Sequence, residues 1–166
     1  MSLARRLRQL LVLWFIALPV LALPVIAPSL VEAQTPVKLP EEPLTIETAA
    51  GAKHRFTVEV ASTREQQETG LMFRTELAPD RGMLFDWSGM YPAAMWMKNT
   101  LIPLDMLFID ADGTILDIEE NLRPESLDVV SAGVPVRAVL ELAGGSAKRL
   151  GLKVGDRVRN RIFTAP

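Results

Sequence analysis

Short alternating segments separated by turn-forming residues fill most of this chain. In residues 54–60, three apolar side chains fall on one side of an extended backbone, and the polar side chains between them fall on the other. This period of two is typical of a half-buried strand. Strands are predicted over residues 54–60, 82–86, 94–98, 104–109, 114–120, 135–142 and 156–163. We therefore expect a mainly β domain, at the margin of α+β, that forms a compact antiparallel β-barrel or β-sandwich.

One short helix and one helical turn interrupt this pattern. Ser62 and Thr63 are each followed three residues later by a side chain that can complete a capping box. Gly70 can end a helix in a left-handed conformation, so a helix is predicted over residues 64–69. Two glycines and a serine precede a predicted helical turn at 147–150.

The N-terminus has the three-part organisation of a secretory signal. Three arginines within the first eight residues precede an apolar run over 10–27, and a small-x-small motif follows at 31–33. Residues 1–33 are therefore predicted to be a signal peptide that is removed. A retained membrane anchor is the alternative, because the apolar run approaches the roughly 20 residues of a spanning helix. Two prolines within the run favour removal over anchoring.

Export determines where the rest of the chain works. Residues 34–43 hold three prolines and two adjacent glutamates, which predict an extended linker. Residues 44–163 are expected to form a single domain in a periplasmic or extracellular compartment. Contact with a membrane is expected only through the export signal, if that signal stays uncleaved.

Composition excludes several kinds of function. Removal of residues 1–33 takes away three arginines and one glutamate, so the formal charge changes from −2 to −4. A modest negative charge without a basic block speaks against nucleic acid as a partner. The sequence has no cysteine, which excludes thiol catalysis, disulfides and cysteine metal sites. No cofactor is predicted.

Residues 70–110 have the most unusual content of the chain. They hold six of the seven methionines and two of the three tryptophans, with charges placed among apolar residues. In an alternating strand, Trp96 and Lys98 point to one side while the methionines beside them point to the other. If this segment pairs with residues 105–109 as a hairpin, Lys98 lies opposite Asp105.

Two interpretations of these charges stay open. The first is a structural ion pair at the rim of a sheet. The second is a pocket floor, where Lys98 and Arg74 hold an anion or a hydroxyl-rich ligand beside Trp96.

Five ordered blocks of residues resemble a known family. The blocks are Gly70-Leu71-Met72-Phe73-Arg74, Gly82-Met83-Leu84-Phe85, Met95-Trp96-Met97-Lys98-Asn99-Thr100, Ile102-Pro103-Leu104-Asp105-Met106 and residues 151–156. Together they are similar to the DUF192 family, a group without an assigned function. The resemblance covers about residues 44–163 and implies a compact, mainly antiparallel β-sandwich or barrel with short helices, often preceded by an export signal. It implies no reaction. Residues that match the family's motif blocks are Arg74, Trp96, Lys98, Asn99, Thr100, Asp105 and Glu141.

The preferred hypothesis is a non-catalytic small-ligand-binding or accessory module. Its ligand is expected to be small and anionic or sugar-like, because a tryptophan, a cation and a carboxylate can stack, pair and accept hydrogen bonds at one concave place. The candidate ligand-binding residues are Arg74, Trp96, Lys98, Asn99, Asp105 and Glu141.

Two alternatives belong to other functional classes. One is an envelope enzyme that uses Asp105 or Glu141 as a general acid or base, and its signature would be a buried carboxylate with a raised pKa. The other is periplasmic copper(I) binding through Met95 and Met97, because thioethers are soft ligands. Apart from this copper site, no metal site is predicted. No catalytic residue is predicted either, because the sequence offers no nucleophile with a base beside it.

Overall fold

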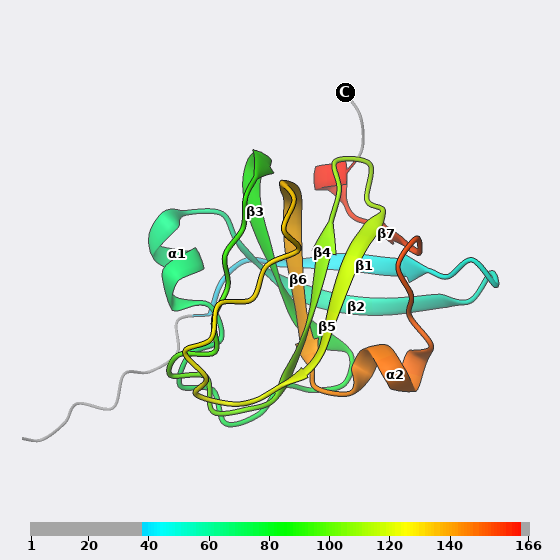
Figure 1. The fold of residues 1–166 in the computed structure, drawn as a ribbon. Helices are drawn as coiled ribbons and strands as arrows, with labels where there is room; N and C mark the ends of the chain where they lie inside the picture. Colours follow the sequence, from blue (N-terminus) through cyan, green and yellow to red (C-terminus); the bar gives the residue numbers. More distant parts are fainter. Residues whose placement is uncertain (1–37, 164–166) are drawn as a thin grey trace, which may run out of the picture. The chain divides into compact units, whose positions relative to one another are not determined.

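A computed structural model describes residues 38–163, which form a seven-stranded sheet with short helices beside it (Figure 1). The strands are β1 Glu41–Glu47, β2 Lys53–Ala61, β3 Arg81–Tyr91, β4 Leu104–Ile109, β5 Ile115–Leu122, β6 Val136–Ala143 and β7 Arg157–Arg159. The helices are α1 Arg64–Thr69, α2 Ser146–Leu150 and a 3-10 turn, η1 Arg161–Phe163. The prediction of a mainly β domain with one short helix and one helical turn is confirmed.

The strands lie in the order β5-β4-β6-β3-β2-β1-β7. Neighbouring strands are antiparallel except for β2 and β3, which are parallel. A parallel pair cannot be joined by a tight turn, because the chain must return to the same end of the sheet. The connection between β2 and β3 makes this return and carries α1.

The sheet curls into a half-barrel. In Figure 1, β1 and β2 pass behind β4 and β6 and cross them. The two outer strands of the sheet meet at one end, where Thr114 forms a bridge with Arg157 and the Val158 N–H donates to the Gly113 carbonyl oxygen at 2.7 Å. A Cβ at Gly113 would lie 2.3 Å from the Val158 carbonyl oxygen, so only glycine permits this approach. The contact covers part of both sheet edges.

An apolar cluster lies on each face of the sheet. The inner core contains residues from β5 and from β7, the two outermost strands of the sheet, and these can meet only because the sheet curls. Its members include Leu44, Ile46, Phe56, Val58, Leu84, Leu107, Ile115, Leu140 and Val158. The outer core lies on the opposite face and contains Leu71, Met83, Phe85, Met95, Met97, Met106, Phe108 and Val139. Successive residues of β4 alternate between the two, as the period of a strand requires. Both faces of the central strands are therefore buried.

Three segments differ from their predicted structure. Strand β1 begins at Glu41, inside the predicted linker, although no strand was predicted there. Residues 94–98 are not a strand, because the segment makes one isolated bridge, from Met95 to Val130. The predicted strand at 156–163 ends at Arg159 and continues as the 3-10 turn.

The predicted signal peptide at 1–33 lies outside the described residues. Within residues 38–163, no helix has the length and apolar content of a membrane span.

Asp105 is fully buried on β4 and holds three backbone amides. One carboxylate oxygen accepts hydrogen bonds from the N–H groups of Asn121 at 2.7 Å and Gly145 at 2.9 Å, and the other accepts from Ala147 at 2.7 Å. The N-cap of α2 is Gly145, which has no side chain to cap the helix. Asp105 therefore supplies from a neighbouring strand the capping carboxylate that α2 lacks.

Glu141 is another buried carboxyl of the sheet, and its surroundings are the opposite of those of Asp105. It lies on the central strand β6 between Met83 of β3 and Met106 of β4, on the outer-core face, and is 4% exposed. No group within residues 38–163 donates a hydrogen bond to it. Burial raises the pKa of Glu141 to about 8, because the charged form would lose its hydration without gaining a partner.

Replacing Asp105 by Asn should destabilise the fold strongly. The amide nitrogen would face amide donors, and hydrogen bonds to a charged group contribute about 1.5–3 kcal/mol each, so we expect a loss of about 3 kcal/mol or more in the free energy of unfolding. Urea unfolding measures this loss in the free energy of unfolding. The control is Glu120→Gln, which removes an exposed charge from β5 and should change stability by less than about 0.5 kcal/mol. Equal stability of the Asp105 variant and the parent would contradict the capping role.

Glu141 should make the stability of the fold fall as pH rises. Its folded pKa of about 8 exceeds the ordinary value of 4.5, so its contribution is complete below about pH 4.5 and is lost as pH rises to about 8. Glu141→Gln stays uncharged, and urea unfolding between about pH 5 and pH 9 should show a clearly flatter profile for this variant.

The matched control for Glu141 is Glu119→Gln. Glu119 also pairs with Met106 but is only partly buried on β5. The free energy of unfolding of this variant should fall with pH as steeply as that of the parent. Identical slopes for the parent and Glu141→Gln would show that Glu141 is ionised in the folded protein.

Candidate functional site: an aromatic groove

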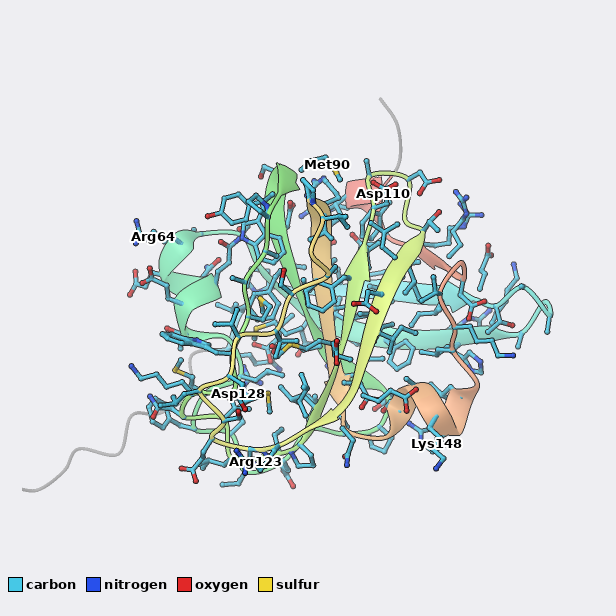
Figure 2. All side chains as sticks on the ribbon, viewed as in Figure 1. Arg64, Met90, Asp110, Arg123, Asp128 and Lys148 are labelled. Carbon is cyan, nitrogen blue, oxygen red and sulfur yellow. The ribbon has the colours of Figure 1, made fainter. Side chains whose placement is uncertain are left out.

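An open groove of about 510 Å³ lies between α1, the end of β3 and the segment 94–96. Its lining consists of Arg64, Gln67, Glu68, Phe85, Trp87, Tyr91, Ala94, Met95 and Trp96. Figure 2 shows the position of two landmarks, Arg64 on the outer side of α1 and Met90 near the tip of β3. The volume is within the range of small-molecule sites, about 300–1,000 Å³, and aromatic groups dominate the wall.

Three aromatic rings stack along one wall of the groove. Phe85 and Trp87 have ring centroids 6.3 Å apart, and Trp87 and Tyr91 have centroids 5.9 Å apart with planes inclined by 9°. A bulge in β3 brings Tyr91 to this position, because the pairing of β3 with β6 shifts between Asp86 and Tyr91, and Ser88 takes a positive φ of 58°. Tyr91 is 51% exposed, so the outer end of the stack is open to solvent.

The bulge is held by a largely buried ion pair. Asp86 pairs with Arg137 of β6, and its carboxylate also accepts the Ser88 N–H at 2.6 Å. An arginine and a backbone amide on one carboxylate fix the direction of the chain at the bend.

Helix α1 forms the second wall and is tied to the sheet by Gln67. The Gln67 side-chain amide donates to the carbonyl oxygens of Asp86 at 2.8 Å and Ala61 at 3.3 Å. The helix begins with the predicted capping box, formed by Thr63 and Gln66. A helix of six residues is marginal in isolation, so these bonds are what keep the wall in place.

Trp96 closes the groove from the third side. The burial of residues 95–98 alternates, with the methionines inside the outer core and Trp96 and Lys98 outside, as predicted. Trp96 is 47% exposed, and the Lys98 ammonium lies 5.1 Å from the centroid of its ring. This cation–π contact orients the indole and places a positive charge beside the groove.

The predicted pairing of Lys98 with Asp105 is wrong. Strand β4 pairs with β5 and β6, so residues 94–98 never form a hairpin with it. The carboxylate of Asp105 faces backbone amides, and Lys98 is exposed over the indole of Trp96. Residues 94–98 cannot pair with β4, because β5 and β6 already occupy both of its edges.

Arg74 belongs to a different place on the surface. Its guanidinium makes a two-point contact with Glu59, at 2.5 and 2.7 Å, and Glu59 also accepts the Leu39 N–H at 2.9 Å. Burial opposes ionisation of Glu59, but the hydrogen bonds from Arg74 and from Leu39 outweigh it and lower the pKa of the carboxyl. Arg74 therefore belongs to a structural ion pair with Glu59. It does not line the groove that contains Trp96.

The remaining candidates are loop residues and core residues. Asn99 takes a positive φ of 56°, its carbonyl oxygen accepts the Phe73 N–H at 2.8 Å, and its side-chain amide lies 3.7 Å from the Met72 sulfur. Thr100 is buried and its backbone carbonyl accepts the Glu125 N–H. These contacts join three loops over the outer core and lie outside the groove lining.

No metal centre of acidic or histidine ligands occurs in the part of the chain that the structure describes. Met95 and Met97 are 9% and 1% exposed and pack in the outer core. Copper(I) binding through these two thioethers stays a prediction.

Sequence reasoning selected Trp96 and Lys98 but missed most of the groove. Trp87, Tyr91 and Gln67 were not predicted as site residues. The stack of Trp87 and Tyr91 depends on the bulge in β3, and the sequence signal that could have revealed it is the pair Ser88-Gly89 inside an otherwise apolar strand.

Comparison with solved structures gives relatives with the same fold, among them a protein from Sinorhizobium and one from Novosphingobium. A Sinorhizobium meliloti 1021 protein described as a "putative transcription regulator" is 49% identical, with a TM-score of 0.73, over 75% of this chain and 97% of that chain. A protein of unknown function from Novosphingobium aromaticivorans DSM 12444 is 42% identical, with a TM-score of 0.72, over 76% of this chain and 90% of that chain. The search of curated proteins gave no match.

The family comparison agrees with the motif blocks and with the fold. The sequence matches DUF192, described as "uncharacterized ACR", over residues 45–160, which include every strand from β2 to β7. This chain therefore belongs to the DUF192 family.

Proposed function

We propose that this protein is a non-catalytic module that binds a small sugar-like ligand in the aromatic groove. The observation that supports the proposal is the arrangement of two exposed aromatic side chains, Tyr91 and Trp96, on two sides of one hollow, with Trp87 stacked between Phe85 and Tyr91. Aromatic faces pack against the apolar faces of a ring, while Gln67 and Glu68 at the same place can exchange hydrogen bonds with hydroxyl groups.

The charge of the groove suits a ligand that carries an acidic group. Lys98 lies on the indole of Trp96, and Arg64 lines the groove from α1. Arg64 also pairs with Glu68 at 2.7 Å, but both side chains are largely exposed, so the pair is weak and can exchange partners. A sugar with a carboxylate or phosphate substituent would find positive charge on two sides.

An enzymatic function has less support. Asp105 is occupied by three backbone amides and is fully buried. Glu141 has the raised pKa expected of a general acid, but it is enclosed by the outer core, so a substrate could reach it only after the core had opened. The description of the Sinorhizobium relative suggests contact with nucleic acid, and the formal charge of −2 argues against this for the present chain.

The groove should respond to sugars through its tryptophans. Residues 38–163 contain Trp87 and Trp96, and both line the groove. We expect maltotriose, triacetylchitotriose or the acidic sugar trigalacturonate to change the tryptophan fluorescence saturably. Trp96→Ala and Tyr91→Ala should each raise the Kd about tenfold, which corresponds to about 1.4 kcal/mol of lost packing.

The matched control is Phe73→Ala, which removes a partly exposed aromatic ring outside the groove lining and should leave the Kd unchanged. Absence of a saturable response to all three sugars at about 10 mM, with the protein folded, would refute sugar binding, since that concentration detects even millimolar affinity.

We also infer that the domain works outside the cytoplasm. The support is the order of basic, apolar and small residues in 1–33. The protein recovered from a periplasmic fraction should begin at Gln34, as measured by intact mass. Ala33→Asp should block the cleavage and retain the longer chain. Recovery of the uncleaved parent chain from the cytoplasm would end this proposal.

A further inference from the structure

A second pocket lies at the start of β2, beside the end of α2. Its volume is about 470 Å³, and its polar lining consists of Lys53, His54, Arg55, Asp80 and Arg149. None of these residues lines the aromatic groove, so the two hollows are separate.

The two arginines of this pocket have no carboxylate partner among residues 38–163. Arg149 donates one hydrogen bond, to the Ser146 hydroxyl at 3.3 Å, and Arg55 makes no ion pair or side-chain hydrogen bond in that part of the chain. The arginines of β7 and η1 differ, since each holds a glutamate or an aspartate within 3.1 Å. An unpaired guanidinium keeps its full capacity to bind an anion.

The balance of charge in the pocket is positive. Its lining has three basic side chains, Lys53, Arg55 and Arg149, and one carboxylate, Asp80. The Lys53 ammonium is partly neutralised by Glu47 at 2.8 Å. The arginines therefore carry most of the attraction, and they come from two different elements, β2 and α2.

A backbone amide of β2 also points to this place. The Thr57 N–H donates to the Asp80 carbonyl oxygen at 3.0 Å, on the side of β2 that faces β3. Because amides alternate along a strand, the Arg55 N–H points to the same side. Strand β3 begins only at Arg81, opposite Thr57, so it does not reach Arg55. The Arg55 amide is thus a donor at a strand edge that the described residues leave open.

His54 also lines this pocket. Its Nε2 atom is buried and has no hydrogen-bond partner within residues 38–163. A buried polar atom without a partner commonly marks a position where water or an ion completes the hydrogen bonds.

We propose that this pocket binds a phosphate group, held by the guanidinium groups of Arg55 and Arg149 and by the Arg55 amide. Two guanidinium groups and one amide supply several hydrogen-bond donors, which suits a tetrahedral group with several acceptor oxygens. Asp80 lies at the same pocket and disfavours a ligand of high charge, but it can accept a hydrogen bond from a hydroxyl or from a singly protonated phosphate.

The experiment is a titration of the full chain with inorganic phosphate, followed by amide NMR at constant ionic strength. The Arg55 amide should shift saturably. Arg55→Gln and Arg149→Gln should each raise the Kd about tenfold, because each removes a charge-assisted hydrogen bond. Arg123→Gln is the control, since Arg123 is an exposed arginine in a distant loop (Figure 2), and it should change the Kd by less than twofold.

Three results would overturn the proposal. They are an unmoved Arg55 amide, unchanged affinity in both arginine variants, and an equal response to chloride at the same ionic strength. Glycerol 3-phosphate in a parallel titration distinguishes a phosphate ester from free phosphate, and tighter binding of either identifies the source. Acetate should bind at least about tenfold more weakly than phosphate, since it offers fewer acceptor oxygens.

Discussion

The carboxylate of Asp105 connects parts of the fold that pairing of strands alone would leave separate. Its three amide partners belong to the end of β5, to the turn after β6 and to the first turn of α2. Ala147 of this helix packs in the inner core. A five-residue helix without its own cap cannot hold that position by propensity, so the position of α2 depends on one buried carboxylate on β4.

The outer core has a different constraint, because loops rather than a second sheet cover it. Met95, Met97 and Leu71 from these loops pack on Met83, Phe85 and Phe108. Methionine suits such a place, since its flexible side chain fills irregular gaps. When loops bury their apolar residues inward, the alternating residues must point outward, and this is why Trp96 and Lys98 are exposed, with Trp96 lining the groove. Glu141 beneath this layer is the exception that packing alone does not explain.

Local patterns in the sequence predicted local structure well and distant contacts poorly. The capping box before α1 and the alternation in β2 and β4 depend on residues within a few positions of each other, and the structure agrees. The pairing of Lys98 with Asp105 assumed that neighbours in sequence are neighbours in the sheet, whereas β6, more than thirty residues later, takes that place beside β4. The groove was predicted only at Trp96, since its other walls arise from a bulge in β3 and from the crossover helix.

Apart from Glu141, the buried charged groups of residues 38–163 have hydrogen-bond or ion-pair partners, whereas the groups at the two open hollows have few. The largely buried pairs Arg74–Glu59 and Arg137–Asp86 and the buried Asp105 each have partners in fixed geometry, an arginine in the two pairs and three backbone amides at Asp105. Arg55 and Arg149, by contrast, lie exposed at a pocket, and the aromatic groove has apolar faces open to solvent. This contrast is the reason why we propose recognition of a ligand by these open groups rather than catalysis by the buried carboxylates.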